Sequence, residues 1–370
     1  MHRSLGRWLV VAVLAFFVLL PLIAAKRQLT EIAINGPFQL AFDSQGNLYV
    51  VEHYGRRIVK IDAAMSSIQV VAGNGKECCF HEGASARSTA IYDVDSMVVD
   101  SKGNVYFGGL NARDGAFIRK LDSATNRVST VAGQPSPSRR ITPEGVPLLQ
   151  ADVRDTKGMV VTKSGSLIVS VDESYLLAEL TSDAKRVAGR GLKGFSGDGG
   201  RAIDATFDLP SFLTVDANGN LFVADYFNHR IRRIDVNTQI VTTVAGNGST
   251  QSSGDNGPAI AAGVVYPFGI AVDSEGNLYV IENGAGTIRR VDSKTGFIHI
   301  IAGTGHQGFS GDGGQATKAE IMPAAIALDS RGNLYFSDIG NNRIRKIDTH
   351  TGVISSVVGN GLPKRKITIL

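Results

Sequence analysis

Cysteine is nearly absent from the sequence. Its 370 residues contain two cysteines, Cys78 and Cys79, which are neighbours in the chain. A disulfide between adjacent residues needs a strained ring, because the two Cα atoms of a relaxed bridge lie about 5.5–6 Å apart. A disulfide framework is therefore excluded, and the stability of the fold must come from a hydrophobic core.

Helix-length hydrophobic periodicity is also missing from the body of the chain. Charged residues make up 19% of the sequence and aromatic residues 7%, whereas glycine occurs 43 times. This composition suits many turns between short strands. A chain of this length can bury a sizeable core, and as an all-β array it need not divide into two domains.

The one long apolar run lies at the N-terminus. Two arginines precede an apolar segment over residues 8–20, and a proline and small residues suited to cleavage follow it. This is the layout of a secretory signal peptide, although the basic pair Lys26-Arg27 fits an uncleaved N-terminal membrane anchor better. The apolar run is shorter than the ~20 residues of a spanning helix. Both alternatives stay open for residues 1–25, an N-terminal apolar helix, and both place residues 29–370 outside the cytoplasm, as a secreted, periplasmic or membrane-anchored domain.

A unit of four short apolar segments recurs six times. Its marker is a Gly-Asn or Gly-Ser turn at intervals of 57, 62, 54, 57 and 56 residues, at Gly46, Gly103, Gly165, Gly219, Gly276 and Gly332. Such turns between apolar runs are strong hairpin signals, so each unit predicts one antiparallel four-stranded sheet. Six sheets in succession predict an all-β, six-bladed β-propeller, with a β-sandwich or a solenoid as the alternative. Residues 29–35 or 367–370 would close the ring, and we favour residues 29–35, which look like a fourth strand.

The repeated text resembles a known family. The segments NHRIRRID (residues 228–235) and NNRIRKID (residues 341–348), with GNLFVAD and GNLYFSD before them, are similar to NHL repeats. The resemblance extends over all six units, and residues 172–180 of the third unit depart from it most. The GFSGDGG loops resemble those of exported bacterial NHL-repeat proteins and of the teneurin propeller. The resemblance implies a propeller fold but no single activity, because this fold hosts binding modules and several enzymes.

Acidic residues recur at two positions on one predicted face. The links between blades and the turns between second and third strands emerge on that face in an antiparallel blade. One acidic position lies in the links, at Glu82, Glu144, Asp198, Asp255 and Asp312, and the other ends the second strands, at Glu52, Asp172, Asp225, Glu282 and Asp338. These carboxylates would suit a cation site or an acidic surface for a polar ligand, and a Ca²⁺ site would need several converging oxygens. Repetition in every blade favours the structural alternative, in which each Asp accepts backbone hydrogen bonds in its turn.

Histidines extend this set of candidates. His53 follows Glu52, and His229 lies in a repeated turn, so both join the carboxylates as candidate ligand-face residues. The unusual run Cys-Cys-Phe-His-Glu contains His81 and Glu82, which are weak candidates for a metal because their spacing is not that of a zinc site. No spacing indicates a catalytic triad, and two G-x-G-x-x-G matches lack the following helix of a dinucleotide site.

The predicted function is that of a non-enzymatic binding or scaffold propeller. It would act as a monomer, without a resident cofactor, and would recognise a protein, peptide or glycan through the face that carries the Gly-rich links. Nucleic acid is not predicted, because the net charge of +4 falls to +2 without the two arginines of residues 1–25, and nearby aspartates balance the basic strands. The alternative is a metal-dependent hydrolase or lyase with a cation on the central axis. Polar residues that break the repeat at axial positions would favour this alternative, but the inner strands read as mostly apolar and repetitive.

Overall fold

The computed structural model describes residues 29–77, 79–91, 93–111, 115–133 and 145–362. The predicted apolar helix of residues 1–25 lies outside the described residues, as do Cys78, Glu144 and residues 367–370. None of the helices within the described ranges has the length and apolar character needed to cross a membrane.

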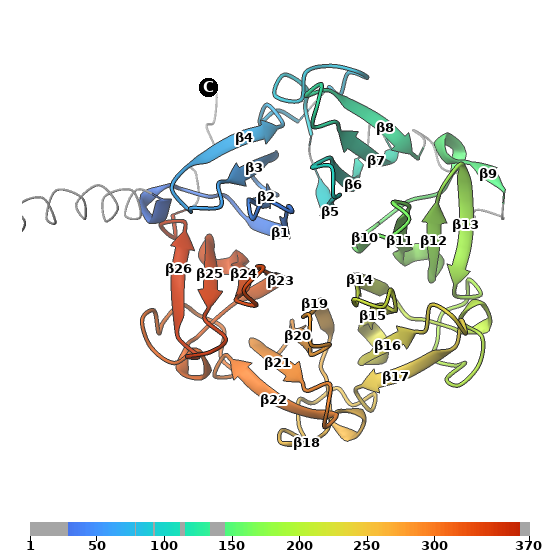
Figure 1. The fold of residues 1–370 in the computed structure, drawn as a ribbon, viewed down its shortest axis with the longest axis vertical. Helices are drawn as coiled ribbons and strands as arrows, with labels where there is room; N and C mark the ends of the chain where they lie inside the picture. Colours follow the sequence, from blue (N-terminus) through green and yellow to red (C-terminus); the bar gives the residue numbers. More distant parts are fainter. Residues whose placement is uncertain (1–28, 78, 92, 112–114, 134–144, 363–370) are drawn as a thin grey trace, which may run out of the picture.

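Six antiparallel sheets are arranged as blades around a central axis (Figure 1). Blades 1 and 2 contain β1 (Pro37–Phe42), β2 (Leu48–Glu52), β3 (Arg57–Ile61) and β4 (Ile68–Ala72), then β5 (Val94–Val99), β6 (Val105–Asn111), β7 (Gly115–Leu121) and β8 (Val128–Ala132). Blades 3 and 4 contain β10 (Met159–Val161), β11 (Leu167–Val171), β12 (Leu176–Leu180) and β13 (Asp183–Ala188), then β14 (Pro210–Val215), β15 (Leu221–Asp225), β16 (Arg230–Ile234) and β17 (Val241–Ala245). Blades 5 and 6 contain β19 (Pro267–Val272), β20 (Leu278–Glu282), β21 (Thr287–Val291) and β22 (Phe297–Ala302), then β23 (Pro323–Leu328), β24 (Leu334–Asp338), β25 (Arg343–Ile347) and β26 (Ile354–Val358).

Each blade is formed by one continuous stretch of chain, and its strands pair in sequence order from the axis outwards. The predicted six-bladed propeller of four-stranded blades is therefore confirmed, and the sandwich and solenoid alternatives are wrong. Two short strands, β9 (Val146–Pro147) and β18 (Gly257–Pro258), add to the outer edges of blades 3 and 5. Single 3₁₀ turns occur in links and turns, at η1 (Leu148–Gln150), η2 (Asp172–Ser174), η3 (Ala202–Asp204), η4 (Tyr226–Asn228), η5 (Ala259–Ala261), η6 (Ala316–Lys318) and η7 (Ile339–Asn341).

The hydrophobic core lies between neighbouring blades. Side chains of a strand alternate between the two faces of its sheet. In β2, Tyr49 and Val51 therefore pack in the cluster shared with blade 2, whereas Leu48 and Val50 pack in the cluster shared with blade 6. Because both faces of each blade are covered in this way, the second strands are apolar at nearly every position except the last.

The N-terminal segment fills the junction between blades 6 and 1. At the other junctions, the glycine after the fourth strand donates a hydrogen bond to a carbonyl of the link, as Gly303 N does to Ala316 O at 3.0 Å. At the last junction Gly359 N donates to Leu29 O at 3.1 Å. Residues 29–36 thus take the place of a link. The prediction that they form a strand is wrong: residues 29–31 form a helical turn, because all four strand positions of each neighbouring blade are already filled.

Candidate functional site

A buried arginine ties the two acidic positions together in blades 4, 5 and 6. Its side chain is 0% exposed in each blade, and so is the carboxylate at the end of the second strand. The same guanidinium reaches the link carboxylate at 2.8–2.9 Å, which gives the chains Asp198–Arg232–Asp225, Asp255–Arg289–Glu282 and Asp312–Arg345–Asp338. Each arginine also donates to link carbonyls, as Arg289 does to Gly263 O at 2.7 Å. These chains bind each Gly-rich link to its blade.

The carboxylates at the ends of the second strands also accept hydrogen bonds from backbone amides. In four blades this carboxylate accepts a hydrogen bond from the residue one or two positions before the inner strand of its own blade begins, at 2.8–2.9 Å: Asn35 N to Glu52, Asp208 N to Asp225, Val265 N to Glu282 and Met322 N to Asp338. Burial raises the pKa of Asp225 to about 6, although the Asp208 amide, Asn228 and Arg232 act to lower it. These carboxylates therefore hold the ends of the inner strands, and they expose no surface to a ligand.

Blades 1, 2 and 3 depart from this arrangement. In blade 1, Val59 stands at the buried arginine position, and Arg57 forms an ion pair with Glu52. In blade 2, Arg119 lies between the rings of Phe80 and Phe117, at 3.4 and 3.8 Å from their centroids. Blade 3 differs as well, because its second-strand acid, Asp172, has no arginine partner among the described residues. The repeat is therefore broken in the first half of the ring.

The other predicted residues lie in different environments. The buried His229 accepts a hydrogen bond from Tyr266 N at its Nδ1 atom (3.2 Å), and burial lowers its pKa. Glu82 is exposed, and its carboxylate accepts two 2.9 Å hydrogen bonds from Thr130. His81 is exposed beside it. Within the described ranges, no three His, Cys, Asp or Glu side chains come together in a way that could hold a metal ion.

Six axial residues mark where the inner strands reach the link face. Strand pairing places one residue of each blade at the equivalent position, in the order Phe38, Asp95, Lys157, Ser211, Phe268 and Ala324. This ring does not follow the repeat: blades 2 and 3 carry charges and blades 1 and 5 carry aromatic rings. The interpretation of the inner strands as apolar and repetitive is wrong at these positions. We define the axial cluster as the four large side chains of this ring, Phe38, Asp95, Lys157 and Phe268, together with their neighbours His53 and Phe212.

The charged half of the axial cluster is centred on Asp95. Lys157 Nζ lies 2.7 Å from one carboxylate oxygen of Asp95, and His53 Nδ1 lies 3.7 Å from the other. Burial acts to lower the pKa of Lys157, but Asp95 raises it above its ordinary value. The His53, Asp95 and Lys157 side chains are 26%, 15% and 27% exposed, so all three remain accessible to a ligand.

A buried carboxylate stands behind these charges. Asp172 is 1% exposed, and neither of its oxygens has a hydrogen-bond partner among the described residues. Burial raises its pKa well above the ordinary value; Lys157 opposes this shift, and Asp155 adds to it. Asp172 is the one second-strand acid that has no arginine, and it belongs to the electrostatic environment of Lys157.

The aromatic half of the axial cluster consists of three phenylalanine rings in mutual contact. Phe38 lies 6.4 Å from Phe212 and 6.1 Å from Phe268, and Phe212 and Phe268 lie 4.4 Å apart, measured between ring centroids. His53 contacts Phe38 at 5.9 Å, which joins the aromatic and charged halves. Gln39 also joins them, since its Nε2 donates to the carbonyls of Asp95 and Lys157 at 3.3 and 3.2 Å.

Of the axial cluster, only His53 was predicted from the sequence. The others carry one signal that sequence alone offers. They stand one or two residues before the apolar position shared by all six inner strands, and their residue types differ widely between units, whereas the shared position varies only among Leu, Met and Ile. This signal becomes meaningful only when the six strands are placed around one axis.

The fold and the repeated text define the class of this protein, a six-bladed β-propeller of NHL repeats. The NHL repeat family model matches residues 207–234, which comprise the end of a link and the first three strands of blade 4. The chain is an NHL-repeat propeller protein. Human teneurin-1 is 26% identical to it over 368 residues, an alignment that covers 76% of this chain and 13% of teneurin-1. The chain therefore spans about an eighth of the length of that relative.

Solved structures share the fold at low sequence identity. An auxiliary nutrient binding protein from Bacteroides thetaiotaomicron has a TM-score of 0.59 at 16% identity, covering 88% of this chain and 70% of its own. Virginiamycin B lyase from Staphylococcus aureus has a TM-score of 0.51 at 15% identity, covering 90% of this chain and 87% of its own. One is named as a binding protein and the other as an enzyme, so the fold accommodates both.

Proposed function

We propose that this protein is an exported or membrane-tethered binding or scaffold propeller. Its ligand is a protein, peptide or glycan that docks on the link face, with the axial cluster at the centre of contact. The observation that carries the proposal is the asymmetry of the axial ring. Features that recur in every blade are explained by the folding of the blades. Residues that break the repeat and remain accessible need a different explanation, and ligand binding provides one.

The chemistry of the axial cluster suits this kind of ligand. Aromatic rings supply apolar contact area with little loss of side-chain freedom, and they dominate many protein interfaces. Tyr54, which is 64% exposed, contacts His53 at 5.3 Å, and Phe227, which is 47% exposed, continues the aromatic surface beside Tyr226. His53, Asp95 and Lys157 add hydrogen-bond donors and acceptors that fix the orientation of a bound peptide or sugar.

Among the candidate residues of the link face, we assign direct contact to the exposed ones. His53 belongs to the axial cluster, and the carboxylates of Asp198, Asp255 and Asp312 are 31–37% exposed while paired with arginine. Glu52, Asp225, Glu282, Asp338 and His229 are buried, and they support the face from below. The signal or anchor segment of residues 1–25 would present this face outside the cytoplasm.

The second candidate is a hydrolase or lyase that acts at the same place. The contact between His53 and Asp95 favours it, because a carboxylate beside an imidazole orients the ring for proton transfer. A cation on the axis would need Asp95 as a ligand, yet Asp95 already pairs with Lys157. Binding therefore remains the first proposal, and a metal such as Ca²⁺ belongs to the second.

The decisive experiment combines metal analysis with a ligand screen. Protein purified without chelator or a metal-binding tag is analysed for metals and then screened on peptide and glycan arrays. Phe268→Ala and Lys157→Ala should each weaken the selected ligand at least ~10-fold, as expected for central contacts. Lys120→Ala, which removes only a surface pair with Asp122, should leave binding unchanged. Stoichiometric metal with turnover would favour the enzyme, and unaltered binding by both axial variants would refute the assigned surface.

A further inference from the structure

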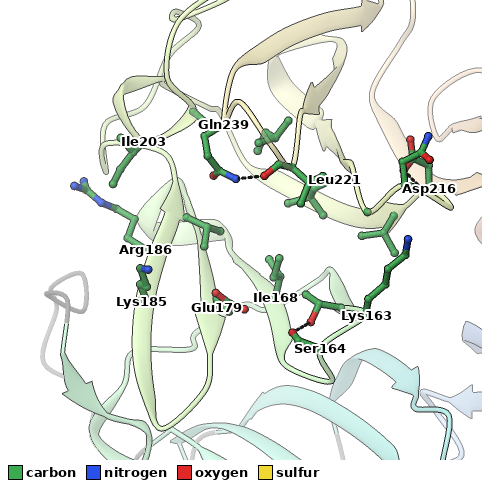
Figure 2. Close-up of a pocket in the computed structure, with 18 of the residues that line it drawn as sticks. Lys163, Ser164, Ile168, Glu179, Lys185, Arg186, Ile203, Asp216, Leu221 and Gln239 are labelled. Carbon is green, nitrogen blue, oxygen red and sulfur yellow. Dashed lines mark hydrogen bonds between the residues drawn. The ribbon is translucent and has the colours of Figure 1, made fainter.

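A cavity of about 870 Å³ opens between blades 3 and 4. It lies at the ends of the strands opposite the link face, next to the turn after β10 and the turn after β14. Figure 2 shows Ile168 and Glu179 of blade 3 facing Leu221 of blade 4, with Ile203 of the link above them. Its volume is in the range of sites for small organic ligands, and it is remote from the axial cluster.

The cavity coincides with a local break in the repeat. In each of the other blades, an aromatic residue of the second strand pairs with a basic residue of the third: Tyr49–Lys60, Tyr106–Lys120, Phe222–Arg233, Tyr279–Arg290 and Tyr335–Lys346. Blade 3 has Ile168 paired with Glu179 instead. A ring and a long basic side chain are therefore missing from this wall.

The junction between blades 5 and 6 provides a direct comparison. The equivalent hollow there has a volume of about 440 Å³ and contains Tyr279 and Arg290. Its link residue Thr317 corresponds to Ile203, since each is the second residue of its 3₁₀ turn. The blade 3–4 cavity is about twice as large as this hollow and has apolar walls that include Val187, Leu221 and Ile234. The hollow between blades 2 and 3 is also large, about 900 Å³, although it retains Tyr106 and Lys120. The missing pair therefore accounts for the apolar character of the blade 3–4 wall and not for its volume alone.

Charge at the rim is unbalanced. Four basic side chains line the cavity, and none of them forms an ion pair with another described residue: Lys163, Lys185, Arg186 and Arg201. The two acids of the lining are engaged in short local bonds. Glu179 accepts from Ser166 at 2.5 Å, and Asp216 accepts from the side chain of Asn220 at 2.7 Å. The lining therefore carries four cations against two carboxylates, an excess of two positive charges.

We propose that the blade 3–4 cavity is a second binding site, for a small anionic amphiphile such as a medium-chain carboxylate. The apolar chain lies against Ile168, Ile203 and Leu221, where it replaces water at apolar walls. The carboxylate lies at the rim beside Lys185, with Lys163 on the opposite side of the cavity (Figure 2). Cationic side chains pair with a carboxylate through charge-assisted hydrogen bonds.

The test uses dodecanoate below its micelle concentration, titrated calorimetrically into the full chain, with dodecyltrimethylammonium as the tail-matched cation. We expect one dodecanoate per chain, bound at least ~10-fold more tightly than the cation, a preference of ~1.4 kcal/mol. Ile168→Tyr restores in the apolar wall the aromatic ring that the other blades carry, and it should weaken dodecanoate at least ~10-fold. Lys185→Gln with Arg186→Gln, at a surface where folding is not at risk, should weaken it several-fold, and Lys346→Gln in blade 6 should not.

Three results would overturn the proposal: no binding of dodecanoate by the wild-type chain, equal binding of the cation, or unchanged binding by the Lys185/Arg186 variant. The last result decides the matter even if the Ile168→Tyr variant fails to fold. Because the axial variants Phe268→Ala and Lys157→Ala leave this cavity intact, they should bind dodecanoate as the wild type does. The proposal for the cavity and the proposal for the axial cluster are therefore tested independently of each other.

Discussion

The substitution Arg289→Met tests whether the buried arginines hold the Gly-rich links onto their blades. The Arg289 guanidinium is fully buried, donates to Gly263 O at 2.7 Å and to Ser253 O at 3.0 Å, and lies 2.9 Å from Asp255 and 3.4 Å from Glu282. Methionine keeps most of the apolar stem but none of the donors. Glu282, which is 0% exposed, would lose its cationic partner while remaining in the protein interior.

Removing one partner of a buried ion pair costs about 3–5 kcal/mol, because the remaining charge is left uncompensated. Asp255 is 31% exposed and regains water, so the lower part of this range is the better expectation. At about 2 °C per kcal/mol for a large domain, the melting temperature should fall by about 6–8 °C. Hydrogen exchange should rise most in the link between β17 and β19.

The neighbouring residue provides a matched control. Arg290 is 33% exposed, and its ion pair is with Asp292 at 3.2 Å, so Arg290→Met should change the unfolding free energy by less than about 1 kcal/mol. Adding Glu282→Gln to Arg289→Met should recover part of the loss, because it removes the uncompensated charge. Thermal unfolding followed by circular dichroism measures all of these variants. If Arg289→Met were as stable as Arg290→Met, the assigned role of the buried arginines would be wrong.

Three further predictions concern other parts of the molecule. Because the folded-state pKa of Asp172 is raised above 3.8, the native state loses stability as pH rises through that pKa. In urea titrations, Asp172→Asn should therefore stabilise the fold by roughly 1–3 kcal/mol at pH 8 and have little effect at pH 4. Equal effects at both pH values would contradict this. Ile34 is 0% exposed in the closing junction, so Ile34→Ala should cost about 2–5 kcal/mol in the same assay, whereas the partly exposed Ile32 should tolerate alanine better. Phe38→Ala should weaken binding of any link-face ligand at least ~10-fold without changing dodecanoate affinity.

The architecture was predictable from the sequence because its signals are local. A Gly-Asn turn at a regular interval, between short apolar runs, specifies a hairpin without reference to the rest of the chain. The same turns show which loops share a face, so both acidic positions could be located in advance. The buried arginines could not be identified in this way, since Arg232 and Arg233 are adjacent and similar in the sequence, yet one is 0% and the other 30% exposed.

What the sequence by itself determined is therefore the repeating unit, the number of blades and the face that carries the links. Only the tertiary structure decided which side chains meet at the centre. Phe38, Phe212 and Phe268 come from three different blades, and their ring contacts form only when the first blade is brought beside the fourth and fifth. The cavity between blades 3 and 4 was likewise hidden, because the loss of an aromatic ring at Ile168 acquires meaning only against the neighbouring blade. Contacts within a blade are short-range and repeat along the chain, whereas contacts across the axis and between blades exist only after all six units have packed together.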